Sequence, residues 1–91
     1  MKLLVVNVGS TSLKFRLFDL AKGEAESASG RLEGIGSGAS QYRMAAASGK
    51  REEGQADWPD YAPALEAMMA FLTEGGEAPL KSLEDLDGVR A

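Results

Sequence analysis

The chain has 91 residues, enough for one small domain, and 44% of them are hydrophobic, as in globular proteins. Its formal net charge of −4 argues against nonspecific nucleic-acid binding, which needs a basic surface. The absence of cysteine excludes disulfides and thiolate metal sites, and the absence of histidine leaves acid, base or ligand roles to other groups.

Two strands joined by a short polar turn are predicted at the start of the chain. The apolar run Leu3–Val6 indicates a first strand buried on both faces. The second strand alternates in polarity and is expected to end near Phe18 or Leu20. One of its faces holds Leu13, Phe15 and Leu17, and the other holds Lys14, Arg16 and Phe18.

The turn between these strands carries groups that suit phosphate beside a metal ion. Gly9 lets a ligand approach the main chain, whose N–H groups can form a nest for an anion. The predicted phosphate-binding residues are Ser10, Thr11, Ser12 and Lys14. The amide oxygen of Asn7 suits magnesium or its water shell. A tight hairpin in which these residues only serve turn geometry is the alternative. The P-loop spacing G-x-x-x-x-G-K-[ST] is absent.

The middle of the chain predicts a third strand and a further hairpin. Glu24–Arg31 is expected to enter the third strand. Gly34–Ala39 matches the dinucleotide pattern G-x-G-x-x-A, but without a clear strand before it or a periodic helix after it we expect a flexible loop. Gln41–Ala47 and Glu52–Asp57 are predicted to pair around a glycine turn. Lys50 in that turn is expected to be solvated rather than to bind phosphate.

One clear helix is predicted over Tyr61–Thr73, with Asp60 as its N-cap and Gly75–Gly76 as its stop. Its expected apolar stripe consists of Tyr61, Leu65, Met68, Met69 and Leu72. Trp58 is expected to anchor the preceding loop rather than to stack on a base. Ser82–Leu86 suggests one more helical turn, and residues 86–91 resemble the lead into a strand.

The opening stretch resembles the N-terminal signature of the acetate kinase (acetokinase) family, N-x-G-S-S-S-L-K, with Thr11 where serine is usual. The resemblance implies an α/β fold of the ribonuclease H-like, actin-like ATPase type. We expect residues 1–91 to form a partial N-terminal domain, a mixed sheet of about five strands with one main helix. With one helix, one face of the sheet would be partly bare, an apolar patch that needs a partner.

The resemblance also implies a function, the ATP-dependent phosphorylation of acetate to acetyl phosphate. Asn7 would help hold Mg²⁺, the hydroxyl residues of the turn would contact the transferring phosphate, and Lys14 would neutralise nucleotide charge. The family's catalytic residues have no counterpart in this chain, and Arg90 lacks the flanking residues of the V-G-H-R-V-V-H-G-G motif. We therefore expect the 91 residues alone to be inactive.

Other interpretations stay open on the sequence alone. The acceptor of a related carboxylate kinase would be butyrate or propionate, and a third alternative is a non-catalytic phosphate-binding or interaction module. The expected partners are ATP and a small carboxylate, with self-association or docking on the remainder of a longer chain. The sequence has no transmembrane run and too short an apolar N-terminus for a signal peptide, so we expect a cytoplasmic protein without nucleic-acid or membrane partners.

Overall fold

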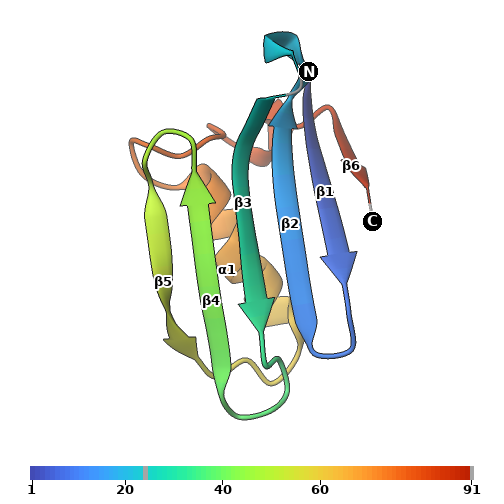
Figure 1. The fold of residues 1–91 in the computed structure, drawn as a ribbon, viewed down its shortest axis with the longest axis vertical. Helices are drawn as coiled ribbons and strands as arrows, with labels where there is room; N and C mark the ends of the chain where they lie inside the picture. The colour runs from blue at the N-terminus through green and yellow to red at the C-terminus, as the bar shows by residue number, and fades with distance from the viewer. Residues whose placement is uncertain (24, 91) are drawn as a thin grey trace.

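The computed structural model describes residues 1–23 and 25–90, with one sheet and one long helix behind it (Figure 1). The strands are β1 Lys2–Val8, β2 Ser12–Asp19, β3 Ala25–Glu33, β4 Ser40–Ala46, β5 Arg51–Ala56 and β6 Gly88–Arg90. The helix is α1, Tyr61–Thr73, and two short 3-10 turns span Leu20–Lys22 and Leu83–Asp85. Glu24, the first residue of the third strand as predicted, lies outside the described residues.

The sheet has six strands in the order β5-β4-β3-β2-β1-β6, one more than the sequence predicted. The strands β1 to β5 form an antiparallel meander, while β6 pairs in parallel with β1. The sequence predicted that residues 86–91 only lead into a strand, whereas residues 88–90 form the sixth strand themselves and pair with Leu3, Leu4 and Val5. The predicted α/β class, with a mixed sheet and one main helix, is confirmed.

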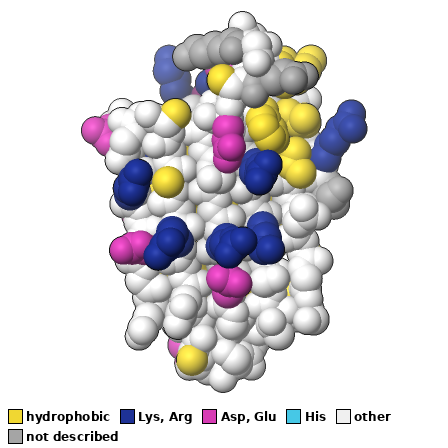
Figure 2. All heavy atoms as spheres, viewed as in Figure 1, with side chains coloured by type: hydrophobic (Ala, Val, Ile, Leu, Met, Phe, Trp, Pro, Cys, Tyr) yellow, Lys and Arg dark blue, Asp and Glu magenta, His cyan; other side chains and the backbone are white. Residues whose placement is uncertain are grey.

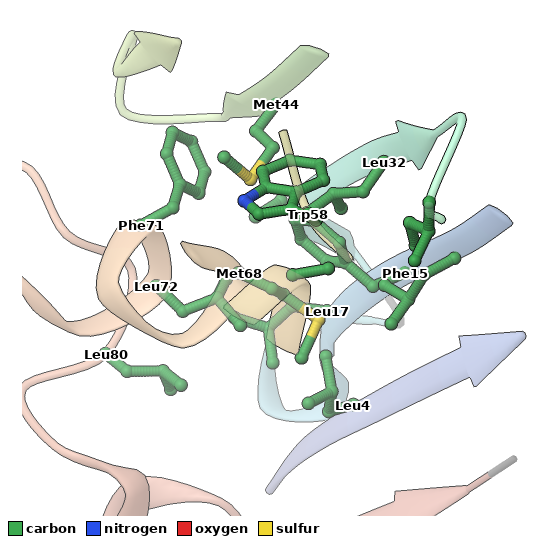
Figure 3. Close-up of a cluster of buried hydrophobic side chains, with 14 residues drawn as sticks. Leu4, Phe15, Leu17, Leu32, Met44, Trp58, Met68, Phe71, Leu72 and Leu80 are labelled. Atoms are coloured by element: carbon green, nitrogen blue, oxygen red, sulfur yellow. The ribbon is translucent and has the colours of Figure 1, made fainter. Parts of the chain in front are cut away.

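The core lies between α1 and one face of the sheet (Figure 3). Leu13, Phe15 and Leu17 of β2 are at most 2% exposed, so the predicted alternation of this strand is confirmed. In β1 only Leu4 is fully buried. The prediction that the first strand is buried on both faces is therefore wrong, because α1 covers only one side of the sheet.

The helix begins and ends where the sequence predicted. The Asp60 carboxylate accepts a hydrogen bond from the Ala62 amide at 3.0 Å, which satisfies one of the unpaired donors of the first turn. The predicted apolar stripe is largely confirmed: Met68 and Leu72 are buried, and Tyr61 and Leu65 pack partly buried against the core. Ala64 and Phe71 are also buried, although they were not predicted. Met69 is 36% exposed, because the buried face is rotated away from it.

The loops at the lower end of the sheet are tied together by backbone hydrogen bonds. The Gly34–Ala39 segment is a loop, as predicted, and it is built from turns with Gly34, Gly36 and Gly38 at positive φ. The Gly36 amide donates to the Trp58 carbonyl at 2.8 Å. Trp58 is 8% exposed and its ring lies 5.7 Å from that of Tyr42, which confirms its role as an anchor of the core.

An apolar hollow of about 530 Å³ lies on the helix side of the sheet, at the β6 edge. Its apolar lining residues are Leu4, Val6, Leu65, Met68, Met69, Leu83, Leu86 and Val89. Val89 is 62% and Leu83 45% exposed, so this is where the chain leaves apolar surface uncovered. None of the helices in the described part of the chain has the length and apolar character needed to cross a membrane.

Candidate functional site

The predicted phosphate turn joins β1 to β2 as a tight hairpin. The Gly9 amide donates to the Ser12 carbonyl at 2.8 Å, which leaves Ser10 and Thr11 at the tip with both residues exposed. A Cβ on residue 9 would lie 2.9 Å from Ser12 Oγ, so a larger residue here would make the Ser12 side chain shift. The backbone of the turn therefore serves hairpin geometry, and its exposed hydroxyls remain accessible to a ligand.

Two contacts brace the turn from the helix side. The Tyr61 hydroxyl, at the start of α1, donates to the Gly9 carbonyl. The Ile35 amide donates to the Thr11 carbonyl at 2.9 Å, and the Ile35 side chain is 4% exposed. Both contacts engage main-chain carbonyl oxygens, which are hydrogen-bond acceptors and do not themselves bind an anion. No local sequence pattern indicated these two contacts, because their partners are distant along the chain.

Asn7 and Lys14 are the predicted residues that the structure brings closest together. They are cross-strand partners in the β1–β2 register, and both are exposed. The alternation of the strands puts them, with Ser12, on the face of the sheet that α1 does not cover. Directly opposed residues have Cβ atoms about 4.5–5.5 Å apart, so an amide oxygen and an ammonium group can reach one ligand here.

The middle of the uncovered sheet face is basic, and hydrophobic side chains gather at the upper right of this face in Figure 2. Figure 2 shows Lys and Arg side chains in a row across the middle of this face, with a few carboxylates around them. A shallow hollow of about 670 Å³ is centred on the row. Its polar and charged lining residues are Asn7, Lys14, Arg16, Glu26, Ser29, Arg31 and Arg43. The sheet face is bare as expected. Its middle is not an apolar patch, because β2, β3 and β4 place charged residues on this side, but Val5, Phe15 and Phe18 also line the hollow.

The described residues do not form a metal site of their own, and Asn7 stays a predicted single ligand to magnesium. No group of three or more Asp, Glu, His or Cys side chains in residues 1–23 and 25–90 is placed to hold a metal. Magnesium usually takes one or two protein oxygens and completes its shell with water and substrate phosphates. The exposed Asn7 amide fits such a role, as one oxygen ligand to an ion that arrives with phosphate.

Lys50 is neither a phosphate ligand nor a solvated residue. Its ammonium group donates to the Phe71 carbonyl at 2.7 Å and the Glu74 carbonyl at 2.6 Å, at the C-terminal end of α1. Its side chain is 17% exposed and lies over the Phe71 ring, 4.7 Å from the centroid. Residues 47–49 of the turn are exposed as predicted, but the Lys50 side chain is not solvated, because the last carbonyls of α1 attract a cation.

Comparison with known protein families shows to which family this chain belongs. The match is to the Acetokinase family and covers residues 2–90. This chain belongs to the Acetokinase family. The resemblance carried by the opening signature is thus confirmed over nearly the whole chain.

Individual relatives agree with this membership. The chain is 37% identical over 89 residues to the acetate kinase of Methanosarcina acetivorans and 34% identical over 89 residues to that of Campylobacter fetus. Each alignment covers 98% of this chain and 22% of the relative. This member of the Acetokinase family therefore spans about a fifth of the length of the curated relatives it matches.

Solved structures show the same fold. The crystal structure of Porphyromonas gingivalis acetate kinase matches with a TM-score of 0.83 and 30% identity, over 97% of this chain and 22% of that one. A propionate kinase from Francisella tularensis matches with a TM-score of 0.77 at 23% identity, over 97% of this chain and 21% of that one. At that identity the second match bears on the fold alone. The sheet and helix thus correspond to part of an acetate kinase domain.

Proposed function

We propose that this chain is the N-terminal, phosphate-binding portion of an ATP-dependent carboxylate kinase that converts acetate and ATP to acetyl phosphate and ADP. One observation carries the proposal. In a member of the Acetokinase family, Asn7 and Lys14 are cross-strand partners on an uncovered sheet face, next to a turn of exposed hydroxyls. This arrangement presents a metal ligand, a cation and hydroxyl donors to one phosphate group.

Each residue has a distinct role in the proposed site. The Lys14 ammonium neutralises charge on the nucleotide phosphates, and Ser10, Thr11 and Ser12 donate hydrogen bonds to the transferring group. The Asn7 amide oxygen completes the shell of the magnesium ion that accompanies ATP. The ion supplies neutralisation of the charge on the phosphate oxygens when it is bound. The bracing of the turn by Tyr61 keeps these groups in position before the ligand arrives.

The 91 residues alone are proposed to bind phosphate without transferring it. Phosphoryl transfer depends on cations and donors all around the phosphoryl oxygens, and the hairpin approaches the ligand from one side only. The test is a hydroxylamine trap for acetyl phosphate, with ATP, magnesium and acetate. Turnover above the buffer background that disappears in Lys14→Ala would contradict the proposal.

Binding is tested by titrating the ¹⁵N-labelled chain with magnesium ATP. The expected result is a set of amide shifts confined to residues 7–14 and the strands beside them. Lys14→Ala should weaken binding by about tenfold or more, because a charge-assisted hydrogen bond is lost. Lys81→Ala is the matched control, since Lys81 is also an exposed lysine but lies outside the site. Equal affinity of the two variants would favour a purely structural hairpin.

The acceptor and the partners stay predictions. The hairpin handles phosphate and not an acyl chain, so butyrate or propionate remains an alternative acceptor, and a non-catalytic phosphate-binding module the alternative function. Activity of the longer protein with each carboxylate would distinguish the acceptors. Self-association or docking on a longer chain is supported by the apolar hollow at the β6 edge. The cytoplasmic location is likewise a prediction.

A further inference from the structure

The basic row on the uncovered sheet face has a feature that works against folding. Lys14 is the direct cross-strand partner of Arg31, and Arg31 is the direct partner of Arg43. Like charges placed directly opposite one another destabilise a sheet. The chain carries a formal net charge of −4, so cations are the minority charge and could have been paired with carboxylates. A negatively charged group bound beside these three aligned cations would therefore relieve their mutual repulsion.

Among residues 1–23 and 25–90, a carboxylate pairs with only one end of the row. Arg43 Nε lies 3.2 Å from Glu53 Oε2. The one other ion pair among the described residues joins Lys50 to Glu52, at 4.0 Å. Within that part of the chain, Lys14 and Arg31 thus have no carboxylate partner, and both line the same hollow.

We infer that Arg31 is a second cationic ligand for phosphate, and that the hollow between Lys14 and Arg31 holds a small polyphosphate anion. The inference rests on the proposed function for the role of Lys14, but it extends the site from the hairpin onto β3. Adjacent strands lie about 4.8 Å apart, so two neighbouring cations can contact successive phosphate groups of one chain. The forked guanidinium of Arg31 supplies two parallel donors, which suits a phosphate oxygen pair.

The surroundings of the row limit the size of this anion. Glu33 lies on the same face as Arg31, two residues along β3, and Glu26 lines the opposite part of the hollow. Glu53 lies beyond Arg43 on β5. Carboxylates therefore flank the cations on three sides. They would repel a long polyanion such as a nucleic acid, while a short polyphosphate fits between them.

The test uses inorganic tripolyphosphate, without magnesium, as the probe for the ¹⁵N-labelled chain and for calorimetry. We expect wild-type binding that weakens as salt is added, with amide shifts at residues 29–31 as well as at residues 14–16. Arg31→Gln should weaken binding by about tenfold. Arg51→Gln is the matched control, because Arg51 is an exposed arginine on the edge strand β5, outside the hollow, and its loss should change affinity less than about twofold.

The outcomes separate this inference from the proposed function. Equal weakening by Arg31→Gln and Arg51→Gln would mean diffuse attraction and would overturn the inference, as would the absence of tripolyphosphate binding. Magnesium ATP binding that needs Lys14 but is unchanged in Arg31→Gln would overturn the inference while the proposed function stands. Tripolyphosphate binding that needs Arg31, without ATP binding, would support the inference and contradict the proposed function.

Folding of the variant does not limit this test. Arg31 is exposed, and its replacement removes two like-charge pairs, so Arg31→Gln should unfold at a temperature equal to or above that of the wild type. Arg31→Lys provides a second variant that keeps the charge and loses the fork. Its affinity should fall between those of the wild type and Arg31→Gln, and an affinity equal to that of Arg31→Gln would argue against a charge contact.

Discussion

Lys50→Met should destabilise the fold markedly, although Lys50 lies in a hairpin turn far from α1 in the sequence. The ammonium group donates to two carbonyls at the end of α1, at 2.7 and 2.6 Å, and its side chain is only 17% exposed. Methionine keeps the length of the stem and removes the charge. The substitution therefore isolates the contribution of the ammonium to the free energy of unfolding.

The size of the effect follows from three overlapping interactions of one charge. Hydrogen bonds to charged groups contribute about 1.5–3 kcal/mol, a cation at a partly buried helix C-terminus up to about 2 kcal/mol, and an exposed cation–π contact about 0.5–1 kcal/mol. Because they share one ammonium group, whose desolvation offsets part of the gain, they do not add. We expect a loss of about 2–3 kcal/mol.

The assay is equilibrium unfolding in urea, followed by the fluorescence of Trp58. This residue is the chain's single tryptophan and is 8% exposed, so its emission reports loss of the core. The midpoint of thermal unfolding should fall by roughly 10–20 °C for a domain of this size. Lys81→Met is the control, because Lys81 is exposed, and it should cost less than about 0.5 kcal/mol. Equal losses in the two variants would refute the capping role of Lys50.

Three further changes test the packing and the edge of the fold. Gly30→Ala should cost about 1–3 kcal/mol in urea unfolding, because its Cβ would lie 2.4 Å from Phe15 Cε1; a loss near zero would show that the core relaxes freely. Tyr61→Phe removes the hydroxyl that donates to Gly9 and should cost about 0.5–1.5 kcal/mol, with faster amide exchange in the turn; unchanged exchange would contradict the bracing. The wild type should self-associate with rising concentration in sedimentation velocity, and Val89→Lys should abolish this; a monomer throughout would rule out self-association at the apolar edge.

Local patterns in the sequence were sufficient to predict the helix and the first five strands of this fold. The alternation from Leu13 to Phe18 identified β2 and its two faces, and Asp60 marked the start of α1, because both signals involve only near neighbours. The signature from Asn7 to Lys14 identified the hairpin and the family.

Contacts between distant segments were not predictable from such patterns. Lys50 reads as solvated because the carbonyls it caps belong to residues 71 and 74. The buried face of α1 depends on how the helix rotates against the sheet, which periodicity does not specify for a helix with apolar residues on several sides. The alignment of Lys14 with Arg31 depends on strand register, which the sequence of either strand alone does not reveal.

The net charge of the chain does not reveal this alignment of cations. The difference between the overall charge and the local charge at the hollow determines which anions the protein can bind. A uniformly acidic surface repels phosphate at every approach, whereas this protein gathers Lys14, Arg16 and Arg31 around one hollow. At physiological ionic strength charges are screened over about 8 Å, so a ligand within the hollow responds to these cations more than to distant carboxylates. Exclusion of nucleic acid by net charge and binding of a small phosphate anion are therefore compatible in one molecule. Raising the salt concentration should weaken the binding of the phosphate anion and should not create nucleic-acid binding.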